Sequence, residues 1–231
     1  MPRTARQNPP QASPRVRRGY FECRFGQLHV HNSMPAGGGF EEGTPLICLH
    51  GAAASGRVFR EFMVLLGRDR SAYAPDLPGC GESDAPPHPV SAAEYAASIA
   101  DFLDSVRLRQ VDVIGQGAGA VLATELALTR PPQVRRVVLA SVPLAAGTAQ
   151  GAAPAGDLAV AALQYPLRER LGRVTQPLLV LRPRDEWWDA AAGVRSALPA
   201  ARVFDLPEQG ADLFQSGPAR AAEAVRAFLP V

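Results

Sequence analysis

Short runs of apolar residues recur along the chain and predict strands that are buried on both faces. The clearest runs cover residues 45–49, 72–77, 111–114, 134–140, 177–181 and 202–206. They do not alternate apolar with polar positions, and short continuous runs of this kind are typical of strands inside a parallel sheet. Residues 20–25 and 27–32 flank Gly26, and the second segment does alternate. This pattern predicts an N-terminal two-stranded hairpin before the first buried strand.

Helical patterns separate these runs. The predicted helices cover residues 57–66, 91–106, 118–129, 187–198 and 218–229. The second helix opens with Ser91-Ala-Ala-Glu94, a capping box that satisfies two backbone N–H groups at a helix start. Strands that alternate with helices predict an α/β fold class, with a mostly parallel central sheet and helices on both faces. In such sheets ligands bind beyond the carboxyl ends of the strands.

Residues 142–176 form the longest segment without a predicted buried strand. Its first half, residues 143–156, is rich in Ala, Gly and Pro, and residues 158–171 are weakly helical. Such a segment beside the strand ends is either a short lid or a surface loop with one packed helix. We predict a single domain over residues 19–231, with residues 142–176 as its lid.

Charge is distributed unevenly along the 231 residues. The chain is 47% hydrophobic and 20% charged, which is an ordinary globular balance. Residues 1–18 hold five Arg and no acidic residue, and we predict a disordered basic tail there. The rest of the chain holds 19 Arg against 22 acidic residues, so we expect no nucleic-acid partner. No apolar run approaches the roughly 18 residues of a membrane span, so we expect no membrane partner.

The three cysteines give no indication of disulfide bonds or of a bound metal. Cys23, Cys48 and Cys80 are odd in number and far apart, so neither a disulfide framework nor a zinc site is indicated. This usage is typical of a reducing compartment, and we expect a cytoplasmic protein with no metal and no cofactor. Neither motif nor composition indicates an oligomeric state.

Three motifs follow successive predicted strands in a fixed order. They are His50-Gly51-Ala52, the segment Asp76-Leu-Pro-Gly-Cys-Gly-Glu-Ser83, and Gly115-Gln-Gly117-Ala-Gly119, which opens a helix. In this order and context the chain resembles the α/β-hydrolase superfamily, in its single-domain esterase and epoxide-hydrolase-like branch. The resemblance covers about residues 20–229 and implies the α/β-hydrolase fold. A fold alone does not give a function.

The resemblance also implies a catalytic triad, and two of its three positions lack the required side chain. The family's nucleophile motif is G-x-S-x-G, and Gly117 stands where the Ser is expected. Ala211, after Gly210, stands at the position of the His base, and no His follows His88. By spacing, Glu186 takes the place of the acid, with Asp185 as a near alternative. An acid without a His to orient has no triad role.

Backbone groups of the family's oxyanion hole do not depend on side chains. The resemblance assigns them to the N–H groups of Ala52 and Ala118, which bind either a ligand oxygen or only water. The expected partner is an apolar small molecule with a carbonyl or carboxylate group. The predicted ligand-binding residues are His50, Gly51, Ala52, Gln116, Gly117 and Ala118.

Two functions remain open at this point. The first is a non-hydrolytic binding or accessory protein with a degenerate triad, a pseudoenzyme. The alternative is a hydrolase or lyase that acts on a small ester or carbonyl substrate by a non-triad mechanism, with Asp185, Glu186 or Asp212 activating water. Cys80 as a nucleophile and Trp187-Trp188 as a stacking platform are weaker candidates.

Overall fold

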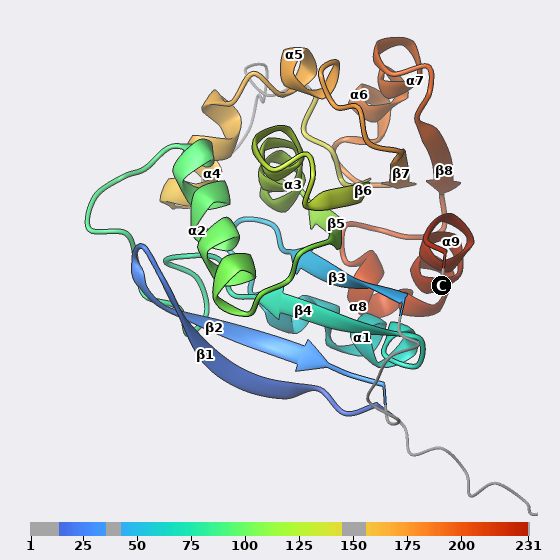
Figure 1. Ribbon diagram of the computed structural model, residues 1–231. Helices are drawn as coiled ribbons and strands as arrows, with labels where there is room; N and C mark the ends of the chain where they lie inside the picture. Colours follow the sequence, from blue (N-terminus) through green and yellow to red (C-terminus); the bar gives the residue numbers. More distant parts are fainter. Residues whose placement is uncertain (1–13, 36–42, 145–155, 231) are drawn as a thin grey trace, which may run out of the picture.

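The computed structural model describes residues 14–35, 43–144 and 156–230, and its centre is one eight-stranded sheet (Figure 1). The strands are β1 (Arg17–Cys23), β2 (Gly26–Ser33), β3 (Gly43–Leu49), β4 (Arg70–Pro75), β5 (Val111–Gln116), β6 (Val134–Ala140), β7 (Leu178–Pro183) and β8 (Arg202–Leu206). Their order across the sheet is β1-β2-β4-β3-β5-β6-β7-β8. β1 pairs antiparallel with β2, and β2 with β4, whereas all other pairs are parallel. The predicted α/β class and N-terminal hairpin are confirmed.

Helices cover both faces of this sheet. They are η1 (Gly56–Phe59), α1 (Arg60–Leu66), α2 (Ala92–Ser105), α3 (Ala118–Thr129), α4 (Asp157–Gln164), α5 (Leu167–Leu171), α6 (Trp188–Ala192), α7 (Val194–Ala197), α8 (Leu213–Ser216) and α9 (Pro218–Phe228). In Figure 1, α2 and α3 lie on one face, and α1, α8 and α9 lie on the other. The carboxyl ends of the parallel strands therefore open between two helical layers.

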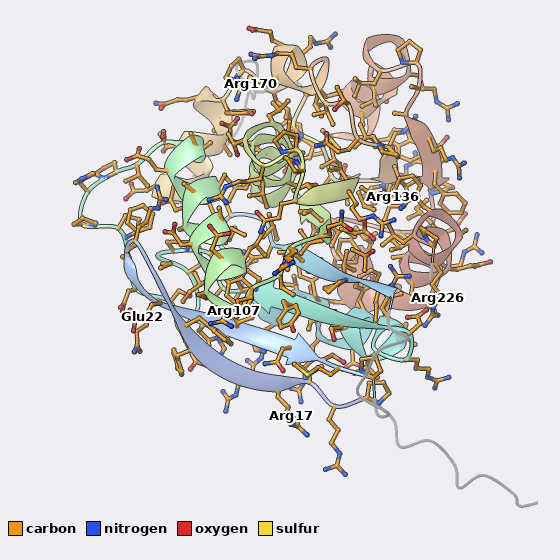
Figure 2. The ribbon with its side chains drawn as sticks, viewed as in Figure 1. Arg17, Glu22, Arg107, Arg136, Arg170 and Arg226 are labelled. Atoms are coloured by element: carbon orange, nitrogen blue, oxygen red, sulfur yellow. The ribbon has the colours of Figure 1, made fainter. Side chains whose placement is uncertain are left out.

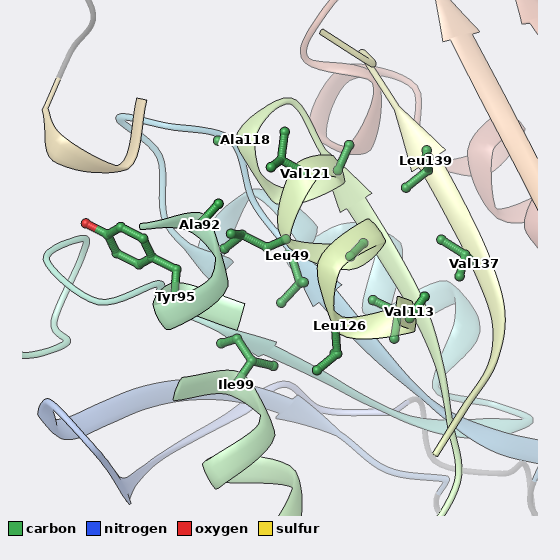
Figure 3. Packing of buried hydrophobic residues seen from close by; sticks show 14 of the residues in the cluster. Leu49, Ala92, Tyr95, Ile99, Val113, Ala118, Val121, Leu126, Val137 and Leu139 are labelled. Atoms are coloured by element: carbon green, nitrogen blue, oxygen red, sulfur yellow. The ribbon is translucent and has the colours of Figure 1, made fainter. Parts of the chain in front are cut away.

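Two apolar cores explain why the buried runs of the sequence do not alternate. Ile47 and Leu49 of β3 pack into the core under α2 and α3, whereas Leu46 and Cys48 pack into the core under α1 and α9. Neighbouring residues of a strand point to opposite faces, and here both faces are covered. Figure 3 shows the first core, where side chains such as Val113 gather between the strands and α3.

The helix boundaries predicted from local sequence signals are confirmed for α2 and wrong for the segment that holds α6 and α7. The capping box at α2 is present: Glu94 N donates to Ser91 Oγ, and Ser91 N donates to Glu94 Oε2. The single helix predicted over residues 187–198 is wrong, because α6 and α7 are separate and Gly193, a weak helix former, lies between them.

The boundary of the predicted basic tail is also corrected. β1 begins at Arg17, so Arg17 and Arg18 pair with β2 opposite Asn32 and His31 instead of extending into solvent. The hydrogen bonds of an antiparallel ladder hold these two residues, which composition alone does not reveal. Residues 1–13 of the predicted tail lie outside the described residues.

The predicted lid segment holds two short helices that pack against α3. Glu125 of α3 accepts hydrogen bonds from Tyr165 Oη at 2.5 Å and from the Arg170 guanidinium. Leu158 of α4 and Leu167 of α5 join the core under α3. Residues 145–155 of this segment lie outside the described residues, and its role as a lid stays a prediction.

Charged side chains lie mainly on the outside of the fold. The labelled residues Arg17, Arg107 and Arg226 in Figure 2 are exposed and come from distant parts of the chain. Among the described residues, no helix has the length and apolar character that a bilayer crossing requires.

Candidate functional site

A cavity of about 820 Å³ lies at the carboxyl edge of the parallel strands. The loops after β3, β5, β6, β7 and β8 form its floor and sides, and α4 contributes Ala159, Ala162 and Leu163. The triad-equivalent positions and most predicted binding residues line it: Gly51, Ala52, Gln116, Gly117, Ala118, Asp185, Glu186, Ala211 and Asp212. The structure thus brings together residues from four separate parts of the sequence.

Gly117 occupies a sharp turn between β5 and α3. Its φ of 56° and ψ of −118° are strained for any residue with a side chain, and its N–H donates to Ala140 O at 3.0 Å. A Cβ on Gly115 would collide with the backbone of Gly119, and a Cβ on Gly119 would collide with the carbonyl of Leu49. These two flanking glycines therefore let the strand and the helix pass closely.

The middle glycine of the same turn is not required by space. A Cβ on Gly117 would meet only Gly51 Cα, at an ordinary contact distance of 3.7 Å. The turn thus keeps the backbone geometry and the room for a side chain that points into the cavity. Glycine supplies neither a hydroxyl nor a thiol there.

The two residues predicted to supply backbone donors, Ala52 and Ala118, line the same cavity as Gly117. Ala118 is the first residue of α3, so its N–H has no partner within the helix. Ala52 lies in the turn after β3, directly before Ala53, whose φ of 56° is unusual for a residue with a side chain. Both residues line the cavity. Such N–H groups suit an oxygen that carries partial negative charge.

Ala211 lies on the loop between β8 and α8 and also lines the cavity. Gln116, beside Gly117, donates a side-chain hydrogen bond to Ala211 O and so ties the end of β5 to this loop. None of the four histidines, all within the described residues, lines the cavity. The cavity therefore holds no imidazole beside Gly117.

His50 is a structural residue, unlike the predicted binding residues around it. It is fully buried, its Nδ1 donates to Gly51 O at 2.7 Å, and its Nε2 accepts from Leu77 N at 2.9 Å. Burial lowers the pKa of His50 to about 4, which keeps the ring neutral. His50 is not part of the cavity lining, and it fixes the loop that presents Ala52.

Three carboxylates line the cavity, and they differ in their surroundings. Glu186 and Asp212 are exposed, whereas Asp185 is half-buried. Asp185 Oδ1 accepts the backbone N–H of Trp187 at 2.9 Å. Its Oδ2 is buried and has no hydrogen-bond partner among the described residues. Asp185 and Glu186 are the two candidates for the acid position. Of these, Asp185 has the buried carboxylate oxygen without a hydrogen-bond partner among the described residues.

Ser141 is a cavity residue that gives no signal in the sequence. It follows β6, is buried, and has a φ of 51°. Its Oγ is buried and has no partner among the described residues. A serine after an apolar run is an ordinary strand end, and a positive φ at a residue other than glycine cannot be inferred from the chain alone.

With the geometry established, comparisons with known proteins identify the family. Residues 44–198, well over half of the chain, match the family model described as the alpha/beta hydrolase fold. The chain belongs to the α/β-hydrolase family.

Two curated relatives of this α/β-hydrolase family member carry enzyme names. A 2-hydroxymuconate semialdehyde hydrolase from Pseudomonas sp. strain CF600 is 29% identical over 140 residues, which cover 57% of this chain and 45% of that protein. A poly(3-hydroxyalkanoate) depolymerase from Ectopseudomonas oleovorans is 35% identical over 98 residues, which cover 42% of this chain and 35% of that protein. The matched parts thus span less than half of the length of these relatives.

Solved structures agree on the fold over nearly the whole chain. A hydrolase from Pseudomonas aeruginosa PA01 superposes with a TM-score of 0.76 and 21% identity, covering 93% of this chain and 98% of that one. The naproxen esterase of Bacillus subtilis gives a TM-score of 0.74 and 20% identity, covering 93% and 92%. At these identities the likeness shows the α/β-hydrolase fold.

Within the part of the chain that the structure describes, one group of His and carboxylate side chains is close enough together to hold a metal ion. His29, His31 and Asp76 are buried, and one potential ligand atom of each lies within 4.8 Å of the others. The Asp76 carboxylate accepts from His29 Nδ1 at 2.9 Å, from Gly56 N at 2.7 Å and from Glu82 N at 2.9 Å. Burial raises its pKa, but these hydrogen bonds outweigh burial and hold the pKa below its ordinary value.

The hydrogen bonds of Asp76 link β2, η1 and the loop after β4. The group therefore has a structural role. The sequence indicates no metal site and gives no sign that these residues meet, because 47 positions separate His29 from Asp76. A metal ion would have to displace the hydrogen bond between His29 and Asp76.

Cys80 is not among the residues that line the cavity. Burial raises the pKa of its thiol, which disfavours the reactive thiolate. Of the two tryptophans predicted as a stacking platform, Trp187 lines the cavity and Trp188 does not. The Trp188 ring instead packs against the Arg182 guanidinium, whose Cζ lies 3.9 Å from the ring centroid.

Proposed function

We propose that this α/β-hydrolase-fold protein binds a small carbonyl compound and does not perform triad catalysis. One observation carries the proposal: the turn at Gly117 keeps its geometry and its room, yet no hydroxyl occupies it and Ala211 brings no imidazole. Loss of either group from a serine triad costs on the order of 10⁶ in turnover, or roughly 8 kcal/mol. Oxyanion donors and binding alone leave roughly 10³–10⁴ over water. Trace esterase activity is compatible with this proposal.

The binding role rests on features that survive without the triad. In this proposal the N–H groups of Ala52 and Ala118 donate to one ligand oxygen, and both residues line the cavity together with the apolar Ala162 and Leu163 of α4. A pocket with apolar walls and a few fixed polar groups is typical of small-molecule sites. Gly51, Gln116 and Gly117 complete the predicted binding set.

The first test looks for covalent chemistry. The protein is incubated with p-nitrophenyl acetate and with a fluorophosphonate, and its mass is measured. We expect no acyl or phosphonyl adduct on the unmodified chain. The double variant Gly117→Ser with Ala211→His is expected to gain an adduct, and Gly117→Ala with Ala211→His is the matched control. Rapid formation of an acyl adduct on a cavity side chain of the unmodified protein would overturn the proposal.

The second test looks for binding at the backbone donors. N-pentylacetamide, a neutral carbonyl probe, is titrated while ligand-observed NMR follows its contacts with the protein. Ala118→Pro removes one donor, and proline is tolerated at the first position of a helix. We expect this variant to weaken binding about fivefold or more, since a lost hydrogen bond is worth roughly 1 kcal/mol or more.

A second candidate function is hydrolysis by a carboxylate that activates water. Asp185, Glu186 and Asp212 line the same cavity as Ala52 and Ala118, and two curated relatives are named a hydrolase and a depolymerase. Turnover of supplied esters near about one per second that disappears in Asp212→Ala, but not in Ala118→Pro, would favour this function over pure binding.

A further inference from the structure

We propose that the edge of the sheet opposite the cavity binds an acidic segment of a partner protein. Solvent-accessible arginines gather at this edge, which we call the basic edge, and they are Arg68, Arg107, Arg109, Arg130, Arg135 and Arg226. The inference does not rest on the proposed function, because the cavity and the basic edge lie at opposite ends of the parallel strands.

Strand direction brings these arginines to one edge. Arg68 precedes β4, Arg107 and Arg109 precede β5, and Arg135 is the second residue of β6. The strands β4, β3, β5 and β6 are neighbours and run parallel. Their first residues therefore share one edge of the sheet, and the cavity lies beyond their last residues.

Contacts between loops make the first half of the basic edge continuous. Arg130, directly after α3, pairs with Asp104 of α2 at 3.1 Å. In the same loop Gln133 Nε2 donates to Leu108 O at 2.7 Å, and Leu108 lies between Arg107 and Arg109 in the sequence. The loops before β5 and β6 are thus tied together.

A second set of contacts joins the end of α9 to this edge. Arg226, in the last turn of α9, pairs with Asp69 in the loop before β4 at 3.1 Å. The buried pair of Arg70 and Asp112 lies between the starts of β4 and β5. Burial lowers the pKa of the Arg70 guanidinium, and the positive charges of Arg136 and Arg226 act in the same direction. The start of β6 and the end of α9 therefore face the same buried group.

Arginine is in excess at the basic edge. Asp69 and Asp104 are each already paired with an arginine. Arg68, Arg107 and Arg109 are exposed, and none of them forms an ion pair with an acidic group of the described residues. Residues 36–42 include two glutamates, precede β3 in the sequence and lie outside the described residues. Counting both glutamates still leaves more arginines than acids.

The N-terminal segment adds charge of the same sign. Pro14 lies beside Gly67, since a Cβ built on Gly67 would be 3.0 Å from Pro14 Cβ, and Gly67 directly precedes Arg68. Residues 1–13 lie outside the described residues, and their sequence contains two arginines and no acidic residue. The segment that is joined to the fold at this edge therefore also favours an anionic partner.

The other side chains of the basic edge favour a protein over nucleic acid or a membrane. The arginine guanidinium is a planar fork that fits a carboxylate. Single strands of nucleic acid stack on exposed aromatic rings, and membrane-surface helices insert apolar side chains. Among the described residues the exposed large apolar side chains are Tyr20, Met34 and Val160, and only Met34, at the end of β2 beside the start of β4, lies near this edge. Asp69 and Asp104 interrupt the arginines and would repel a continuous row of phosphates, whereas a peptide can space its carboxylates around them.

Four probes test the class of partner. They are a fluorescent peptide of six Ser-Glu repeats, the matched peptide of Ser-Gln repeats, an oligothymidylate of equal charge, and vesicles that contain phosphatidylserine. Binding to the full chain is measured by fluorescence anisotropy for the three oligomers and by sedimentation for the vesicles. We expect saturable binding of the acidic peptide alone, weakened about tenfold or more between about 20 and 150 mM NaCl.

A triple variant assigns the binding to the basic edge. Arg68→Gln, Arg107→Gln and Arg109→Gln together remove three exposed arginines that have no acidic partner among the described residues. We expect this variant to bind the acidic peptide about tenfold or more weakly, because three surface ion pairs are lost at once. Circular dichroism should show an unchanged fold, since exposed substitutions away from packing contacts have small effects on stability.

The matched control changes the net charge by the same amount at the other end of the strands. Arg57→Gln, Arg60→Gln and Arg184→Gln replace three exposed arginines that follow β3 and β7. We expect this control to weaken the acidic peptide by about twofold or less, because these positions lie far from the basic edge and salt screens the charges between them.

The outcomes decide between a located surface and a general effect of charge. Equal weakening by the two triple variants, or no saturable binding of the acidic peptide, would overturn the inference. Tighter binding of the oligothymidylate or of the vesicles would overturn the assignment to a protein partner. Ala118→Pro should bind the acidic peptide like the unmodified chain, so failure at the basic edge leaves the proposed function of the cavity intact.

Discussion

A side chain restored at position 117 tests whether the turn between β5 and α3 has the room that the structure gives it. In Gly117→Ala the new Cβ meets only Gly51 Cα, at 3.7 Å, so the cost is backbone strain at a φ of 56°. Such strain amounts to about 1–3 kcal/mol. The lower entropy of the unfolded chain offsets about 0.4–1 kcal/mol of it. We expect a net loss of roughly 0.5–2.5 kcal/mol of unfolding free energy.

The matched comparison is Gly119→Ala, two residues along the same turn. There the new Cβ would collide with the backbone carbonyls of Leu49 and His50, which cannot move without displacing β3. We expect a larger loss than for Gly117→Ala, or failure to fold. Gly117→Ser should match Gly117→Ala within about 0.5 kcal/mol, because both have the same backbone strain and the hydroxyl points into an open cavity.

Unfolding is followed by circular dichroism in urea and by heating. For a chain of this size, a loss of 0.5–2.5 kcal/mol lowers the melting temperature by roughly 1–10 °C. The decisive observation is the order of the two alanine variants. If Gly117→Ala destabilised the protein as much as Gly119→Ala, the turn would have no room for a side chain, and the main support for the proposed function would be lost.

Four further predictions concern buried charged groups and their partners. Arg70 and Asp112 form an ion pair at 3.6 Å, and each side chain is only 1% exposed. In urea unfolding, Asp112→Ala should lower the free energy of unfolding by about 3–5 kcal/mol, whereas Asp112→Leu combined with Arg70→Met should lower it much less. Burial raises the pKa of Asp112 to about 6, above the roughly 4 of an Asp in the unfolded chain, so the stability that Asp112 contributes should be lost as the pH rises from 4 through 6. In a series of melting temperatures measured across this pH range, Asp112→Asn should remove the slope. The lowered pKa of Asp76 acts with the opposite sign, so stability should fall as the pH drops below about 4, and Asp76→Asn should lower stability at pH 7 and flatten the acid limb. Tyr165→Phe removes the 2.5 Å hydrogen bond to Glu125 and should cost about 1.5–3 kcal/mol, and a loss below about 0.5 kcal/mol would contradict the anchoring role of this contact.

Much of the fold could be predicted because the sheet is covered on both faces. Each parallel strand then reads as a continuous apolar run, and β6 and β8 begin and end where their runs do. The short helices were harder to predict, because four or five residues show too little hydrophobic periodicity. The sequence did not predict α8 or the break between α6 and α7 at Gly193.

The site also contains residues that could be predicted from the sequence and residues that could not. Gly117, Ala118 and Ala211 could be found because the resemblance to the α/β-hydrolase family, carried by glycine spacing and strand order, assigns their positions, and all three line the cavity. Ser141 could not, because its importance lies in a positive φ and a missing hydrogen-bond partner. His50 was placed in the binding set by its motif, but both of its ring nitrogens bind backbone groups instead.

The features that the site keeps have different physical reasons. Gly115 and Gly119 are required by packing alone, since any side chain there collides with backbone, so their presence says nothing about ligand binding. Asp185 also has a structural reason, because its Oδ1 accepts the backbone N–H of Trp187 directly before α6. Position 117 differs, since a Cβ there meets only Gly51 Cα, at 3.7 Å. We therefore regard Gly117, rather than its flanking glycines or Asp185, as the residue whose identity separates ligand binding from triad catalysis.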